Sequence, residues 1–223
     1  MSEIAQLQRQ LRKQKRRSLR IQHHRWAEGV LTGLLSQLRP DDVVIDCGAN
    51  QGKVVAALAP SNARIVAFEP DPYAFGVLGG VAADLPNVEL HDCAVGPEAA
   101  RLTLFRAEGF DDDPHNKSLS STLVEGGRGM TADGVEVEVI DLPARIEGLL
   151  AEGRHIAFLK IDIEGAEIDL VNALEDRGLL ARIGFTAVET HEAKFPERAA
   201  DFAALRARIA AAHPAHRVNL DWI

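Results

Sequence analysis

The sequence has few cysteines, no long apolar run and no general excess of positive charge. Cys47 and Cys93 are the two cysteines among 223 residues, and their spacing fits no metal-binding pattern, so we expect packed free thiols rather than a disulfide. No apolar stretch reaches the roughly 18 residues that a membrane span needs. The first residues also lack the apolar region of a signal peptide. We therefore expect a cytoplasmic protein without a membrane span.

The bulk composition fits one α/β domain with an acidic surface. With 46% apolar residues, a chain of this length can bury one good core. Residues 1–25 carry eight Lys or Arg and one Glu, a net charge of +7, and the whole chain carries −8, so the remainder carries −15. Nucleic-acid binding draws on a broad positive surface, and this acidic remainder argues against such a partner.

The basic segment is expected to form a helical arm. Ile4, Leu7 and Leu11 keep helical spacing before charged residues take over, which is typical of a solvated helix. The alternative is docking of the arm on the acidic body of a second subunit, which would make a homo-oligomer. From Trp26 to Leu38 apolar residues recur at helical spacing, which predicts a helix packed on the body. We place the arm and packing helix in residues 1–40 and the single globular domain in residues 41–223.

Strands and helices alternate along most of the domain, which predicts parallel strands joined by right-handed crossovers. The fold class is therefore α/β, a Rossmann-like, mostly parallel, doubly wound sheet. The expected strands are 43–47, 64–68, 87–91, 156–163, 183–190 and a last one at 217–223. The expected helices begin near 52 and run over 71–83, 166–175 and 197–211.

One stretch, about 101–140, interrupts this alternation. Residues 101–105 and 135–139 alternate like half-exposed strands around a polar, Gly-rich segment from about 107 to 134. We expect an antiparallel insertion that carries a mobile loop, because loops longer than about 15 residues are usually lids, binding loops or disordered.

The first expected strand ends in a turn that suits a nucleotide-type ligand. Gly48 allows backbone N–H groups to approach a ligand, and the helix that begins near Gly52 attracts a carboxylate. Asn50 stands where a dinucleotide-binding turn would have its second glycine, so a pyrophosphate would fit poorly. S-adenosylmethionine meets these constraints, because its ammonium suits Asp46 and its ribose suits Glu69 at the end of the next strand.

The remaining cofactor contacts are expected beside the same turn and at the end of the third strand. We expect Ala49 to take part with its neighbours in the turn, and the adenine to lie near Asp92, Cys93 and Ala94. The alternative interpretation is an ordinary strand-to-helix turn with a surface acid at Glu69.

Three segments resemble the signatures of the FkbM-type family of S-adenosylmethionine-dependent methyltransferases. They are Asp46-Cys47-Gly48-Ala49-Asn50-Gln51-Gly52, Phe68-Glu69-Pro70 and the segment Leu159-Lys160-Ile161-Asp162-Ile163-Glu164-Gly165-Ala166-Glu167. The resemblance implies a class I methyltransferase fold and methylation of hydroxyl groups on sugars or polyketide-derived metabolites. It also implies that Asp46, Gly48 and Asn50 hold the methionine moiety and that Glu69 holds the ribose.

Charged residues at two strand ends indicate where the chemistry would lie. Lys160, Asp162 and Glu164 share one side of a strand that is expected to be buried, where charges are costly unless they are paired or line a site. If the strand that ends near Glu189 pairs with it, Glu189 and His191 approach this group, beside the cofactor. A structural ion pair between Lys160 and Glu189 is the alternative, and Glu167 can be explained by stabilisation of the helix dipole.

Methyl transfer to a hydroxyl on a small-molecule or glycan acceptor needs a group that takes the proton. His191 is the first candidate, since an unperturbed pKa of about 6.5 leaves it largely neutral, and Asp162 would orient the acceptor or share the task. Alternatively, Mg²⁺ bound by Asp162, Glu189 and Glu164 would acidify the hydroxyl.

Two other functions compete with this hypothesis. A nicotinamide-dependent oxidoreductase would share the ribose carboxylate, but Asn50 and Asp46 disfavour a pyrophosphate. A non-catalytic module could instead retain the cofactor pocket and bind a partner through the basic arm.

Overall fold

The computed structural model describes residues 3–127 and 129–222 and contains two sheets. The larger sheet is parallel throughout, and its strands in spatial order are β3 (Val88–His91), β2 (Arg64–Phe68), β1 (Asp42–Cys47), β7 (His155–Ile161), β8 (Phe185–Val188) and β9 (Val218–Asn219). The chain therefore leaves β1 in one direction, through β2 and β3, and returns on the other side through β7. This reversal confirms the expected doubly wound sheet and makes the β1–β7 boundary its switch point.

Helices cover both faces of this sheet. One apolar cluster joins the sheet to α5 (Leu142–Ala151), α6 (Glu167–Asp176) and α7 (Ala199–Ala212). The other cluster joins the opposite face to α1 (Glu3–Gln37), α2 (Lys53–Leu58), α3 (Pro72–Ala82) and Trp222. Consecutive residues of β1 contribute to opposite clusters, Val43 to the first and Val44 to the second, as a strand covered on both faces requires.

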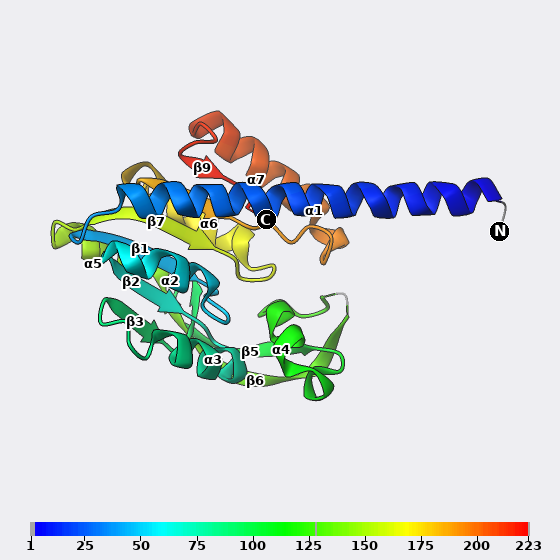
Figure 1. Cartoon of the computed structure of the whole chain (residues 1–223), viewed down its shortest axis with the longest axis horizontal. Helices are drawn as coiled ribbons and strands as arrows, with labels where there is room; N and C mark the ends of the chain where they lie inside the picture. Colours follow the sequence, from blue (N-terminus) through cyan, green and yellow to red (C-terminus); the bar gives the residue numbers. More distant parts are fainter. Residues whose placement is uncertain (1–2, 128, 223) are drawn as a thin grey trace.

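The basic arm and the packing helix form one continuous helix, α1. Its C-terminal part packs on the body through Ala27 and the expected apolar residues up to Leu38. Its N-terminal half extends beyond the rest of the molecule (Figure 1), and there Leu7 and Leu11 are 59% and 54% exposed. Neither α1 nor any other helix within the described residues is long and apolar enough to cross a membrane.

The insertion forms the second sheet, in the order β4 (Ala94–Gly96), β6 (Met130–Asp141), β5 (Ala100–Ala107). β5 and β6 pair in antiparallel fashion as expected, and β4 adds a parallel strand that the sequence did not indicate. The segment between β5 and β6 is not a plain loop. It contains η2 (Phe110–Asp112), α4 (Pro114–Lys117) and η3 (Ser118–Ser120), and Thr122 pairs with Phe105 of β5.

The ends of several elements have local causes. Asp71 accepts hydrogen bonds from the backbone N–H groups of Tyr73 and Ala74 and so begins α3, and Asp141 begins α5 in the same way through Ala144.

Three short 3₁₀ helices complete the described chain, at η1 (Ala59–Ser61), η4 (Leu180–Arg182) and η5 (Pro196–Arg198). Cys47 and Cys93 are both free and buried, which confirms the expectation for the thiols.

Candidate functional site

A cavity of about 620 Å³, part of it open to solvent, lies beyond the carboxyl ends of β1, β2 and β7. Ligand sites in open α/β sheets occur at this place. Its lining residues include Gly48, Asn50, Phe68, Glu69, Cys93, Ala94, Leu104, Ser118, Ser121, Asp162, Ile163 and Glu164. The cavity thus has one end at Glu69, which we call the ribose end after the ligand expected there from the sequence, and another at Asp162 and Glu164, which we call the acidic end.

At the ribose end, Glu69 is held by the backbone. Its Oε2 accepts a hydrogen bond from the N–H of Asn50 at 2.7 Å, and its Oε1 accepts one from the N–H of Asp71 at 2.8 Å. Burial raises the pKa of Glu69 to about 7, although both N–H groups favour the charged form. The position of this carboxylate is therefore fixed before any ligand binds.

In the turn after β1, Gly48 packs against the backbone of Asp162 and so joins the two ends of the cavity. Gly48 has a φ of 74°, and a Cβ at this position would lie 1.9 Å from the carbonyl oxygen of Asp162. Only glycine fits this approach. Asn50 has a φ of 47°, a conformation that asparagine tolerates, and its side-chain amide donates to the carbonyl of Ser118.

Asp46 lies beneath the cavity rather than in its lining. It is fully buried, and its Oδ1 is 3.2 Å from Nζ of Lys160, which also lies 3.2 Å from Oδ2 of Asp162 and donates to the carbonyl of Gly48 at 2.8 Å. Burial opposes a charge on Lys160, but Asp162 and Asp46 outweigh burial and raise its pKa. Lys160 is therefore an ammonium group that holds the turn against the loop after β7.

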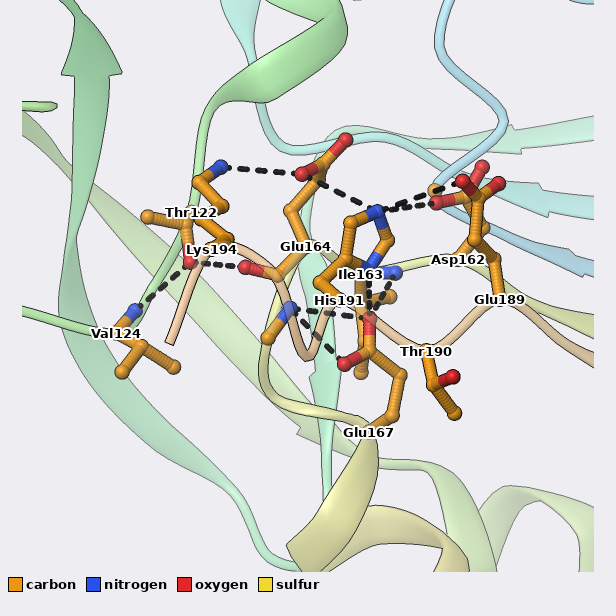
Figure 2. Close-up of polar contacts among 12 residues, drawn as sticks. Thr122, Val124, Asp162, Ile163, Glu164, Glu167, Glu189, Thr190, His191 and Lys194 are labelled. Carbon is orange, nitrogen blue, oxygen red and sulfur yellow. Dashed lines mark hydrogen bonds and ion pairs between the residues drawn. The ribbon is translucent and has the colours of Figure 1, made fainter. Parts of the chain in front are cut away.

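At the acidic end, several side chains converge on His191 (Figure 2). Its Nε2 lies 3.3 Å from Oε2 of Glu164 and 3.7 Å from both Oδ1 of Asp162 and Oε1 of Glu189. Its Nδ1 lies 2.9 Å from Oε1 of Glu167, a residue with no solvent exposure. The expected approach of His191 to Asp162 and Glu164 is confirmed, whereas Lys160 pairs with Asp46 and Asp162 instead of with Glu189.

The charges at the acidic end differ from the expectation of a neutral imidazole. Burial would lower the pKa of His191, but Glu164 and Glu167 raise it to about 11, so that the ring is protonated at neutral pH. Burial, together with the neighbouring charge of Asp162, raises the pKa of Glu189 to about 8. In this state His191 is a hydrogen-bond donor and cannot accept a proton.

The segment from Phe110 to Leu123, which we call the strap, closes one side of the cavity. Gln51 donates to the carbonyl of His115, and Ser121 donates to Oδ2 of Asp71. Lys194 bridges the strap and the acidic end, because its Nζ contacts the carbonyl of Ser120. The same Nζ lies 3.0 Å from Oε2 of Glu164 (Figure 2). The insertion therefore contributes walls to the cavity.

The structure places the residues expected at the cofactor in two groups. Five line the cavity: Gly48, Asn50, Glu69, Cys93 and Ala94. Four described residues lie outside its lining: Asp46, Ala49, Gly52 and Asp92. Asp92 is exposed to solvent, and Gly52 begins α2 and packs near Leu78.

Two residues of the site were not among those expected to function. Glu167 ends the Leu159-to-Glu167 motif on the first turn of α6, where the sequence alone suggested a helix-dipole effect, and only the structure shows that it is buried and holds His191. Lys194 lies in an irregular segment, where no pattern in the sequence marks it.

The fold and the cavity define the class as a Rossmann-like class I methyltransferase fold. A model of the family described as "Methyltransferase FkbM domain" matches residues 46–214. The chain therefore belongs to the FkbM methyltransferase family, as the motifs indicated, and not to a family of nicotinamide enzymes. This family implies S-adenosylmethionine as the cofactor.

Three relatives show how far the similarity extends. The "31-O-demethyl-FK506 methyltransferase FkbM" of Streptomyces tacrolimicus is 33% identical over 178 residues, covering 70% of this chain and 68% of that protein. The "AMB antimetabolite synthetase AmbE" of Pseudomonas aeruginosa is 28% identical over 70% of this chain but only 9% of its own length. "Methyltransferase 1" of Beauveria bassiana is 28% identical over 61% of this chain and 60% of its own length.

Proposed function

We propose that this chain is an S-adenosylmethionine-dependent O-methyltransferase that acts on a hydroxyl group of a sugar, glycoconjugate or secondary metabolite. The observation that carries the proposal is the cavity, which has a preset carboxylate at the ribose end and a polar cluster at the acidic end. The name of the Streptomyces relative describes a substrate that lacks an O-methyl group, which is consistent with an oxygen acceptor.

In this proposal the cofactor lies along the cavity. The ribose hydroxyls donate to Glu69, and the adenine packs beside Phe68, Cys93 and Ala94, which line that end. The methionine end lies against Gly48 and the loop after β7. In a direct contact of its ammonium with Asp46, as the sequence suggested, the ammonium would share this buried carboxylate with Nζ of Lys160, which lies 3.2 Å from Oδ1.

The acidic end would serve the acceptor. The hydroxyl oxygen attacks the methyl carbon as the bond from carbon to sulfur breaks, and the hydroxyl proton passes to a carboxylate of the cluster. Asp162, which lines the cavity, is the first candidate for this role. Glu189, whose pKa is raised to about 8, would take the proton only in the fraction of molecules in which it is ionised. Protonated His191 and Lys160 then orient these carboxylates. The alternative, in which Mg²⁺ is bound by Asp162, Glu164 and Glu189 and acidifies the hydroxyl, stays a prediction.

The test is binding followed by turnover. Titration calorimetry with S-adenosylhomocysteine should show one site per chain, and labelled S-adenosylmethionine should transfer its methyl group to a member of a hydroxylated acceptor panel. Asp162→Asn should lower turnover by about 100-fold or more, the usual contribution of a general base, while the exposed-site variant Glu98→Gln should not. Glu189→Gln should have a smaller effect at neutral pH, because that carboxyl group is then mostly protonated. Absence of cofactor binding by folded protein would refute the proposal.

A non-catalytic role on the same fold would give a different result. In that case the protein would bind S-adenosylhomocysteine, but Asp162→Asn would leave its biological activity intact. Charge reversal in the basic arm would then abolish that activity.

We also propose that the basic arm docks on the acidic body of a second copy. The arm carries +7 against −15 for the rest of the chain, and Leu7 and Leu11 are exposed where α1 extends beyond the body. Light scattering should show a dimer at low salt that dissociates as salt screens the contact. Arg9→Glu with Arg12→Glu should give a monomer, and a wild-type monomer at low salt would contradict this proposal.

A further inference from the structure

The acidic end gathers more carboxylates around one imidazole nitrogen than a single hydrogen bond needs, and two of these carboxylates also contact ammonium groups, those of Lys160 and Lys194. Three carboxylates face Nε2 of His191 at 3.3, 3.7 and 3.7 Å. A good N–H···O bond is about 2.7–3.2 Å long, so Nε2 has no carboxylate partner at that distance among the described residues. The oxygens surround the nitrogen instead of one of them closing on it (Figure 2).

These separations match the spacing of ligands around a metal ion. Nitrogen and oxygen ligands lie about 2.0–2.2 Å from Zn²⁺, which places two ligands of a tetrahedral ion about 3.4 Å apart. One ligand atom each from Asp162, Glu164 and His191 lies within 4.8 Å of the others. The three ligand atoms therefore lie close enough together to face one ion.

The imidazole is already oriented as a metal ligand would be, and an ion bound at Nε2 would displace the proton that this nitrogen carries in the metal-free chain. Its Nδ1 is held by Glu167, which is fully buried and also accepts hydrogen bonds from the backbone N–H groups of Ile163 and Gly165. Metal-binding histidines usually donate their second ring N–H to a carboxylate or carbonyl, which fixes the ring and directs the other nitrogen at the ion. Glu167 occupies that position, so the support for the ligand is built into the folded chain.

We infer that Asp162, Glu164 and His191 bind a divalent transition-metal ion, with Glu167 as the positioning residue that orients the imidazole. An imidazole among carboxylates favours ions such as Mn²⁺, Fe²⁺ or Zn²⁺ over Mg²⁺, which prefers oxygen ligands alone. Asp162 and Glu164 also line the cavity, so the ion would lie within reach of an acceptor hydroxyl. This inference does not rest on the proposed methyl transfer.

The experiment uses metal-free full-length protein titrated with Mn²⁺, Zn²⁺ and Mg²⁺ in the absence of cofactor. We expect one equivalent of Mn²⁺ or Zn²⁺ per chain, weaker binding of Mg²⁺, and modulation by an imidazole nitrogen in the pulsed EPR spectrum of the Mn²⁺ complex. His191→Asn should remove the nitrogen modulation. Glu167→Gln should keep the modulation and weaken metal binding about 10- to 100-fold, which is the usual effect of removing a carboxylate that supports a metal ligand.

The matched control removes carboxylates from the exposed acidic run of the strap. Asp111→Asn with Asp112→Asn should leave metal affinity unchanged. Wild-type protein that binds no Mn²⁺ or Zn²⁺, or binds Mn²⁺ without nitrogen modulation, would overturn the inference, and so would equal weakening by the control variant. Because the decisive spectrum is that of the wild type, an unstable variant does not obscure the result. Protein that binds S-adenosylhomocysteine but no metal would refute this inference and leave the proposed function standing.

Discussion

The two ends of the cavity are built in different ways. At the ribose end, Glu69 is fixed by two backbone N–H groups, and the residues concerned lie in the strand-to-helix turns after β1 and β2. At the acidic end, the side chains come from the loop after β7, the start of α6 and the segment after β8. The first end depends on local backbone geometry, and the second depends on the packing of three separate segments.

Under the proposed function, this difference separates cofactor binding from methyl transfer. The carboxylate that would bind the ribose is held by backbone N–H groups of two turns, so cofactor affinity should survive changes at His191 or Glu189. The acidic end is sensitive to any movement of α6 or the strap, because Glu167 and Lys194 hold its side chains in place. Gly48 joins the two ends, since it packs against the carbonyl of Asp162.

The largest effect is expected from Gly48→Ala, which would disturb both ends together. The added methyl group would lie 1.9 Å from the Asp162 carbonyl oxygen in a backbone with a φ of 74°. We expect a loss of about 3 kcal/mol in the free energy of unfolding, measured by urea denaturation, and loss of S-adenosylhomocysteine binding.

The matched control for Gly48→Ala is Gly148→Ala in α5, where a Cβ would meet no atom within 4 Å. That substitution should be neutral or stabilise by up to about 1 kcal/mol. Equal stability of both variants would contradict the close approach at Gly48.

The next largest effect is expected from Glu69→Gln, which would affect the ribose end alone. Loss of the charge weakens hydrogen bonds from the ribose hydroxyls and should lower affinity for S-adenosylhomocysteine by about 100-fold in titration calorimetry. Glu98→Gln, an exposed change, should leave affinity intact. An unchanged dissociation constant for Glu69→Gln would show that the ribose lies elsewhere.

The pH dependence of cofactor binding should report the same carboxylate. Burial raises the pKa of Glu69 to about 7, and its ionised form is the better acceptor for ribose hydroxyls. Affinity should therefore be greatest above pH 7 and fall by up to about tenfold per unit as the pH decreases below it. Glu69→Gln should remove this dependence, and a slope that persists in the variant would assign it to another group.

The smallest effect is expected from Lys194→Met, which removes the bridge between the strap and Glu164 but keeps the aliphatic stem. Release of S-adenosylhomocysteine should become about 3- to 10-fold faster in stopped-flow experiments, as expected for the loss of a charged hydrogen bond of about 1 kcal/mol. Lys53→Met, at an exposed position on α2, should have no effect. An unchanged release rate for Lys194→Met would mean that the strap does not control exit.

Individual strands and helices show how much of the fold could be predicted from the sequence. The strands at β1, β2 and β7 were predicted within a residue or two because their apolar runs are bounded by charged or turn residues. β4 was missed because three residues carry no periodicity, and the short helices of the strap were missed because its composition is that of a loop. Tertiary hydrogen bonds, such as that from Thr122 to the carbonyl of Glu164, order the strap.

The sequence by itself determined the parallel sheet, the family and the position of Glu69, because these depend on short-range patterns and on motifs of adjacent residues. Only the tertiary structure decided the partners of charged side chains. Asp46 faces Lys160 instead of the cavity, and His191 is protonated among carboxylates from separate segments. Charge states and ion pairs depend on burial and on distances between residues far apart in the chain, and no local pattern encodes them.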